Sequence, residues 1–152
     1  GGSLFNKLAK EGADLLVKTL TMLEEGTATR SKQDESQSSY AKMLTKDMGC
    51  LDFTQDAVTL ERLIRGLNPW PSAYTRIQNK TLKIYAAEIV SEDMISSEMA
   101  SGSVIAVDKK SFTVRCGKGA LRILNLQLEG KKRMETSAFL LGYKVEKGMQ
   151  LG

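Results

Sequence analysis

The apolar residues of the chain first recur at helical spacing and later alternate. Between residues 3 and 26 they return every three or four positions, which is typical of one face of an amphipathic helix. We place Ser3 at its N-cap and Gly26 at its end. Residues 27–39 are polar and without period, which indicates a linker or surface crossing. The segment 39–49 fits a short helix or a strand.

A second helical period covers residues 54–67. Its apolar face consists of Ala57, Leu60, Leu63, Ile64 and Leu67. Thr54 is the expected N-cap, with Gln55 and Asp56 in the first turn. The sequence NPWP at 68–71 ends this helix, because proline cannot continue it. We expect Trp70 to pack against the core at this rigid joint, and stacking on a nucleic-acid base is the alternative.

After Pro71 the spacing of apolar residues changes from three or four positions to two, so that apolar and polar residues alternate, which predicts strands. Leu82, Ile84 and Ala86 form the expected buried side of the second strand. A loop is expected at 91–102 and a short helix at 133–143. The five predicted strands, joined by short turns, span 73–77, 81–90, 103–108, 112–116 and 120–128. Such short strands predict a small closed or nearly closed β-barrel.

The composition lowers the prospect of catalysis. The chain has 152 residues and no histidine, the commonest general base near neutral pH. No carboxylate pair, metal cluster or activated nucleophile stands out, so we expect no catalytic, cofactor-binding or metal-binding residue. Two cysteines far apart in sequence suggest reduced thiols. Without a membrane-spanning run or signal peptide, we expect a cytoplasmic location.

Positive charge is concentrated in the second part of the chain. The net charge is +4, and residues 1–50 are electrically balanced. Five basic residues between 62 and 83 have no acidic residue among them, and "GKKRM" at 130–134 places three cations together. "CGKGA" at 116–120 is flanked by strands and predicts a hairpin turn with Lys118 at its tip. This bias fits either a polyanion partner or a solvated basic surface.

Several segments together resemble the methionyl-tRNA formyltransferase family. They are "LERLIRGLNPWPSAYT", "LKIYAAEIV", "CGKGALRILNLQLEGKKRM" and "FLLGY" followed by "KGMQLG". The N-terminal helix and linker resemble the last helix of that family's catalytic domain and the segment after it. The resemblance implies an enzyme that moves a formyl group from 10-formyltetrahydrofolate to the amino group of methionyl initiator tRNA. It implies that its Rossmann-like domain holds an Asn-His-Asp centre, which this chain lacks.

The resemblance implies an α+β fold, mainly β: a five-stranded OB-like β-barrel with flanking helices. The expected divisions are 1–26 for the terminal helix of the catalytic domain, 27–50 for the linker and 51–152 for the barrel. The barrel's basic face would hold the tRNA. We assign this contact to Arg65, Arg76, Lys80, Lys83, Lys118, Arg122, Lys131, Lys132 and Arg133.

Two other functions remain open at this point. A barrel of a formyltransferase that acts on a small molecule would only pack against its catalytic domain. A generic single-strand-binding barrel would carry exposed aromatic residues on its strands. The expected partners are initiator methionyl-tRNA and the catalytic domain, with no membrane. The apolar face of the first helix should dock on the barrel, pair with another copy, or fray.

Overall fold

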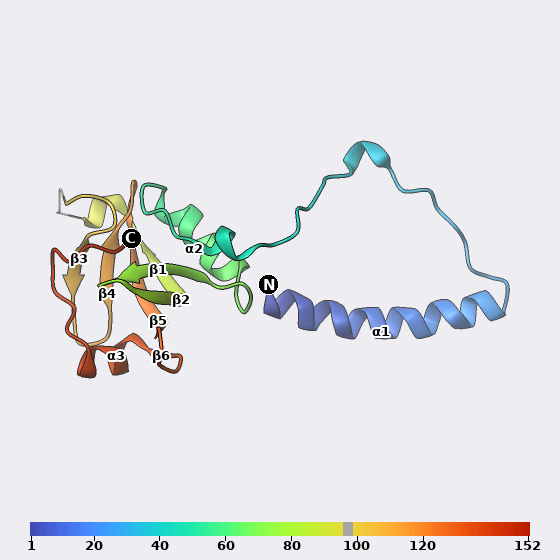
Figure 1. The fold of residues 1–152 in the computed structure, drawn as a ribbon. Coiled ribbons are helices and arrows are strands. Elements are labelled where there is room, and N and C mark those ends of the chain that lie inside the picture. Colours follow the sequence, from blue (N-terminus) through green and yellow to red (C-terminus); the bar gives the residue numbers. More distant parts are fainter. Residues whose placement is uncertain (96–98) are drawn as a thin grey trace. The chain divides into compact units, whose positions relative to one another are not determined.

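The computed structural model describes residues 1–95 and 99–152, which form two compact units, Gly1–Met43 and Leu44–Gly152. The first unit consists mainly of α1 (Gly2–Glu24), followed by an extended segment with the 3₁₀ turn Glu35–Gln37 (Figure 1). The expected N-cap was wrong. Ser3 lies inside α1, and Gly1 caps the helix without a side-chain bond. No helix in the described part of the chain is both long and apolar enough to span a membrane.

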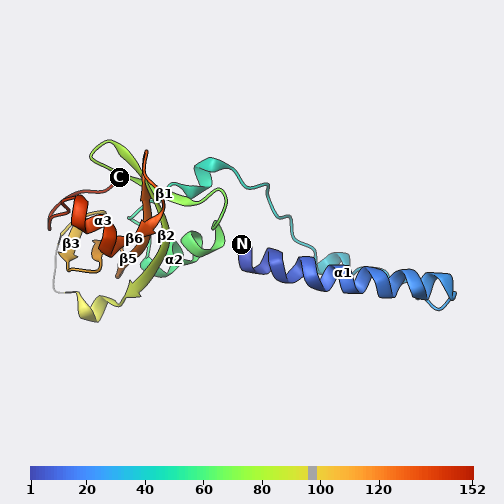
Figure 2. The same ribbon diagram turned by 90° about the horizontal axis from the view of Figure 1, so that it is seen from below.

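The second unit is built on an antiparallel sheet, seen from two directions in Figures 1 and 2. Its strands are β1 (Ala73–Ile77), β2 (Lys80–Val90), β3 (Val104–Val107), β4 (Phe112–Arg115), β5 (Ala120–Leu128) and β6 (Met134–Glu135). They pair in the order β1-β2-β5-β4-β3, and β6 pairs with β5. The five predicted strands are therefore present, and the short β6 was not expected.

The ladder of strands is open, so the expected closed OB-like barrel is not confirmed. Among the described residues, no strand pairing joins β1 to β3. The C-terminal segment instead lies along β3 and reaches β1. The amide of Val104 donates to the carbonyl of Met149 at 2.8 Å, and the amide of Gly152 donates to the carbonyl of Arg76 at 3.1 Å. The chain end thus satisfies backbone groups that an open sheet edge would leave unpaired.

Helix α2 (Ala57–Gly66) covers part of the core with the predicted apolar face. Ala57, Leu60 and Ile64 are buried. Its N-cap differs from the expected Thr54: the Asp56 carboxylate accepts from the amide of Thr59 at 2.8 Å. The amide of Thr54 instead bonds to Asp52. Two Asx-type turns therefore follow each other, and the second one starts the helix.

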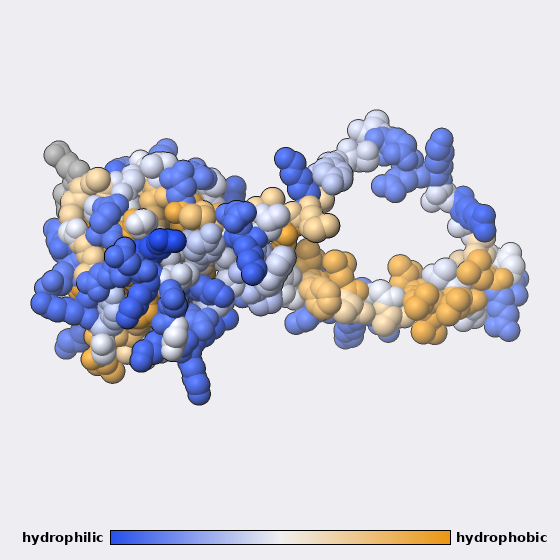
Figure 3. Space-filling model, in the orientation of Figure 1, coloured by the Kyte–Doolittle hydropathy of each residue, from blue (hydrophilic) through white to orange (hydrophobic). Residues whose placement is uncertain are grey.

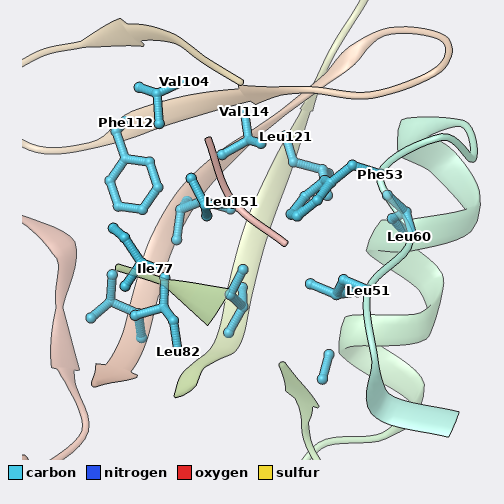
Figure 4. Close-up of a cluster of buried hydrophobic side chains, with 14 of the residues drawn as sticks. Leu51, Phe53, Leu60, Ile77, Leu82, Val104, Phe112, Val114, Leu121 and Leu151 are labelled. Atoms are coloured by element: carbon cyan, nitrogen blue, oxygen red, sulfur yellow. The ribbon is translucent and has the colours of Figure 1, made fainter. Parts of the chain in front are cut away.

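The core lies between the inner face of the sheet and α2 (Figure 4). Phe112, Leu121 and Leu151 come from β4, β5 and the C-terminal segment, and each is at most 1% exposed. Leu51 and Phe53, just before α2, fill the space beside Leu60. Both ends of this unit therefore contribute side chains to one core.

A register shift in β2 changes which alanine faces the core. Pairing with β5 is irregular between Ile84 and Ala87, so Ala86 falls out of the alternation. Leu82 and Ile84 are buried as predicted, but Ala87 packs on the core instead of Ala86. A bulge inserts one extra residue and so inverts the order of inward and outward side chains beyond it.

The corner after α2 holds an exposed tryptophan, so the expected packing of Trp70 was wrong. Its side chain is 57% exposed. The buried residue of this turn is Ser72, whose amide donates to the carbonyl of Leu67 at 3.0 Å and whose hydroxyl donates to that of Pro69 at 2.8 Å. The turn is thus closed by a small residue and its backbone, and the indole projects outward.

Three connecting segments complete the fold. The segment 39–49 ends in a 3₁₀ turn, Lys46–Gly49, rather than a strand. The expected loop at 91–102 contains the 3₁₀ turn Glu92–Met94, and its residues 96–98 lie outside the described part. The helix expected at 133–143 is shorter: α3 spans Thr136–Gly142 after β6.

Candidate nucleic-acid interface

The alternation of side chains along β1 and β2 places basic residues on the outer face of the sheet. Leu82 and Ile84 point into the core, so Thr81 and Lys83 point outward. Arg76 on β1 lies opposite Thr81. Lys83 lies opposite Gln127 of β5 on its other side. The sheet thus brings cations from separate strands to one surface.

The loop after β5 adds further cations to this surface, because it is bonded to the neighbouring strands. The amide of Glu129 donates to the carbonyl of Thr81 at 2.8 Å, and the amide of Thr81 donates to the Glu129 carboxylate at 2.9 Å. The Gln127 side-chain amide donates to the carbonyl of Lys131 at 2.8 Å. We call the basic face the set Arg76, Lys80, Lys83, Lys131, Lys132 and Arg133. Lys80 has the parity of Leu82 by alternation, and it belongs to the set as a rim residue at the β1–β2 turn because its charge acts on Glu129.

The Glu129 carboxylate lies among the cations of the basic face. The backbone amide of Thr81 lowers the pKa of Glu129, and the charges of Lys80 and Arg76 lower it further. Glu129 and Lys83 also line a shallow groove of about 330 Å³ between β2 and the loop. The Glu129 carboxylate accepts a hydrogen bond from the Thr81 amide and so holds the loop in place. One negative charge does not neutralise the six cations of the basic face. Figure 3 shows hydrophilic side chains over much of this unit's visible surface.

Arg133 is held more closely than the other cations of the basic face. Its Nε donates to the Asn125 side-chain oxygen at 2.5 Å. Its guanidinium carbon lies 4.3 Å from the centre of the Tyr85 ring, a cation–π contact. The Tyr85 hydroxyl donates to Gln127 at 2.8 Å, and the Asn125 amide donates to Glu135 at 2.8 Å. Four side chains from three strands therefore fix one guanidinium, two of them directly and two through Tyr85 and Asn125.

The remaining three predicted cations lie elsewhere. Arg65 is exposed on α2 and forms an ion pair with Glu61 at 3.0 Å. Arg122 lies farther along β5, where Glu88 approaches it at 3.5 Å. Lys118 lies in the predicted turn between β4 and β5, and its carbonyl accepts from the amide of Ala57 at 2.9 Å. The structure thus separates these three from the basic face.

A second charged cluster fixes the turn between β4 and β5. Arg115 donates to both carboxylate oxygens of Glu92, at 2.7 and 2.9 Å, and the amide of Gly119 also donates to Glu92. These bonds, with the Arg115 bond contributing most, lower the pKa of Glu92 to about 2. Because Arg115 and Glu92 neutralise each other, this cluster stabilises the turn and does not offer a site for a polyanion.

The two thiols differ in accessibility, because Cys50 is exposed and Cys116 is buried. Both cysteines are free, as predicted. Burial raises the pKa of the Cys116 thiol to about 12, so it stays protonated at neutral pH. No group of three or more metal-ligating side chains occurs within residues 1–95 and 99–152.

Sequence reasoning did not single out the polar residues that support Arg133. Tyr85, Asn125 and Gln127 were assigned no function from the sequence. A signal is present in hindsight: the amides of Asn125 and Gln127 alternate with apolar residues in the second half of the strand 120–128. Polar residues in the middle of an apolar strand face outward and need partners there.

Comparison with known proteins identifies the family. Residues 43–144 match the family described as "Formyl transferase, C-terminal domain". Proteins named methionyl-tRNA formyltransferase resemble the chain over nearly its whole length: 52% identity in Lachnospira eligens, 46% in Agathobacter rectalis and 42% in Geobacter metallireducens. The alignments cover 100%, 97% and 99% of this chain and 49%, 47% and 47% of those proteins. The chain therefore spans about half the length of these relatives.

Solved structures share the fold at low identity. A HypX variant from Aquifex aeolicus matches with a TM-score of 0.61 and 17% identity, over 88% of this chain and 24% of that one. HypX from the same organism in complex with tetrahydrofolic acid matches with a TM-score of 0.60 and 18% identity, over 90% and 26%. At such identity the likeness supports the arrangement of elements and nothing about ligands.

Proposed function

Because the chain belongs to the formyl transferase C-terminal domain family, we propose that it is the tRNA-binding part of a methionyl-tRNA formyltransferase. In this proposal the whole enzyme transfers a formyl group from 10-formyltetrahydrofolate to the amino group of methionyl initiator tRNA. The formyl transfer itself belongs to the half of the relatives that this chain does not span. The described residues would supply binding and orientation.

The observation that carries the proposal is the basic face on the outer side of the sheet. Lys83 and Lys131 reach it from β2 and from the loop after β5, and no carboxylate lies within ion-pair distance of either among the described residues. Phosphate contacts by such cations release condensed counterions and give affinity with little dependence on sequence. A scaffold barrel needs no such surface, so the basic face favours tRNA over a small-molecule enzyme.

Salt-dependent binding of fluorescent initiator tRNA, followed by anisotropy, tests the proposal. Each phosphate contact contributes about one unit to the slope of log affinity against log salt. Replacing Lys83 and Lys131 with alanine should therefore lower the slope by about two. Lys144→Ala is the matched control, because that exposed lysine already pairs with Glu146 at 2.7 Å. Equal slopes for both variants, or no wild-type binding at low salt, would favour the scaffold function.

The exposed stripe on α1 fits a second part of the proposal. Phe5, Leu8 and Leu15 are 73%, 60% and 63% exposed, and α1 has no buried residue. Figure 3 shows this apolar surface along the helix. We propose that the other half of the enzyme covers it. Light scattering after gel filtration tests this: a monomer that associates with the separately produced other half supports it, and a stable dimer points to self-association instead.

A further inference from the structure

The cations of the basic face differ in how strongly the protein fixes them. Lysine carries its charge on a flexible stem, and ordering that stem on binding costs conformational entropy. Arg133 is already ordered before binding, by the Tyr85 ring at 4.3 Å and by Asn125 at 2.5 Å. It therefore has less entropy to lose than Lys83 when a ligand arrives.

The same bonds leave most of the Arg133 donors available. Arginine has five N–H donors, and Asn125 takes the one on Nε. Among the described residues, the two terminal NH₂ groups have no hydrogen-bond partner, and the Arg133 side chain is exposed. The network includes the Glu135 carboxylate, which is bonded to the Asn125 amide and forms no ion pair with Arg133. The result is a fixed guanidinium fork on an exposed residue, and no carboxylate of residues 1–95 or 99–152 lies within ion-pair distance of it.

We propose that Arg133 is the anchor of the RNA contact: its free NH₂ groups hold one backbone phosphate in a bidentate pair, and Tyr85, Asn125 and Gln127 position it. Two parallel N–H bonds match two oxygens of a phosphate, which a lysine ammonium cannot do. This inference rests on the proposed function and goes beyond it, because it ranks one cation above the rest and assigns a role to three uncharged residues.

Phosphate binding by Arg133 and positioning by Tyr85 predict different changes in tRNA titrations. Arg133→Ala should weaken binding about ten-fold or more and lower the salt slope by about one, since one phosphate contact is lost. Arg133→Lys should keep the slope and still lose affinity. Tyr85→Leu should weaken binding about three- to ten-fold at an unchanged slope, because the contact remains but must be ordered on binding. Tyr85→Phe keeps the ring and should stay within about three-fold of wild type.

Arg30→Ala and Tyr40→Leu are matched controls, because both residues are exposed, lie in the first unit and are not among the residues that define the basic face. Circular dichroism of each variant establishes that the sheet is intact. If the wild-type protein binds tRNA and Arg133→Ala binds it with the same affinity and the same salt slope, the inference about Arg133 is overturned and the proposed function is not. A fall in slope for Tyr85→Leu overturns the positioning role, since it would mean that a phosphate contact had been lost.

A titration with inorganic phosphate separates this inference from the proposed function. We expect the ¹⁵N–¹H signal of the Arg133 side chain to shift at lower phosphate concentration than that of Arg30, and Tyr85→Leu to abolish the difference. Identical behaviour of both arginines contradicts a built phosphate site. A selective shift of Arg133 in a protein that fails to bind tRNA would leave the phosphate site standing and refute the tRNA-binding function.

Discussion

Replacing Leu151 with alanine tests whether the C-terminal segment belongs to the core. Its side chain is 1% exposed and lies with Phe112 and Leu121 in the buried cluster (Figure 4). Its amide donates to the carbonyl of Gly102 at 2.9 Å. The substitution removes buried methyl groups and leaves that backbone bond in place, so it isolates the contribution of packing.

The expected cost follows from burial and from the position in the chain. Leu→Ala at a buried site lowers the free energy of unfolding by about 2–5 kcal/mol, with the larger values where the cavity cannot collapse. Leu151 lies in a segment that is neither helix nor strand, so the surrounding backbone can relax toward the cavity, and we expect about 2–3 kcal/mol. For a domain of roughly 100 residues, each kcal/mol shifts Tm by about 4–8 °C. Tm should therefore fall by at least about 8 °C.

Urea unfolding followed by circular dichroism measures this change, and Leu141 offers a matched control. Leu141 lies in α3 and is 92% exposed, so Leu141→Ala should alter the free energy of unfolding by less than about 0.5 kcal/mol. If Leu151→Ala and Leu141→Ala have equal stability, the C-terminal segment does not unfold with the sheet. The C-terminal segment would then not be what protects the open edge of the sheet.

Three further predictions concern the N-cap of α2, the ion pair between Arg115 and Glu92, and the two thiols. Asp56→Ala should lower the free energy of unfolding by about 0.5–2 kcal/mol in the same assay, because the cap to Thr59 is lost, and Thr54→Ala, at the expected but unused cap, should cost less. Folding lowers the pKa of Glu92 from 4.5 to about 2, so the ionised carboxylate stabilises the folded protein above about pH 4.5, and this stabilisation is lost as the pH falls toward 2. In urea titrations across this range, the free energy of unfolding of Glu92→Gln should therefore depend less on pH than that of the wild type. Ellman's reagent at pH 8 should label the exposed Cys50 in the native protein and reach the buried Cys116 only after unfolding; equal native labelling of both would contradict the burial.

Much of the fold could be predicted because local patterns decided it. The apolar face of α2 and the alternation of Leu82 with Ile84 follow from helical and strand periods, and both are buried as expected. The exceptions depend on distant contacts. The bulge that exchanges Ala86 for Ala87 arises from pairing with β5, far along the chain. The exposure of Trp70 depends on how the corner packs on Ser72, which no local rule predicts.

The candidate site was harder to predict than the fold. The sequence shows which residues are charged, but whether a charged side chain is available to bind a phosphate depends on the neighbours that the fold gives it. Arg65, Arg122 and Arg133 are equivalent in a count of cations. The fold gives the first two a carboxylate partner and gives the third an aromatic ring and an amide, which order it without neutralising it. A phosphate must compete with Glu61 or Glu88 for the first two, whereas no carboxylate in the described part of the chain forms an ion pair with the third. Affinity should therefore depend on Arg133 more than on the total charge, and strand pairing, which places Tyr85 beside Asn125, creates that difference.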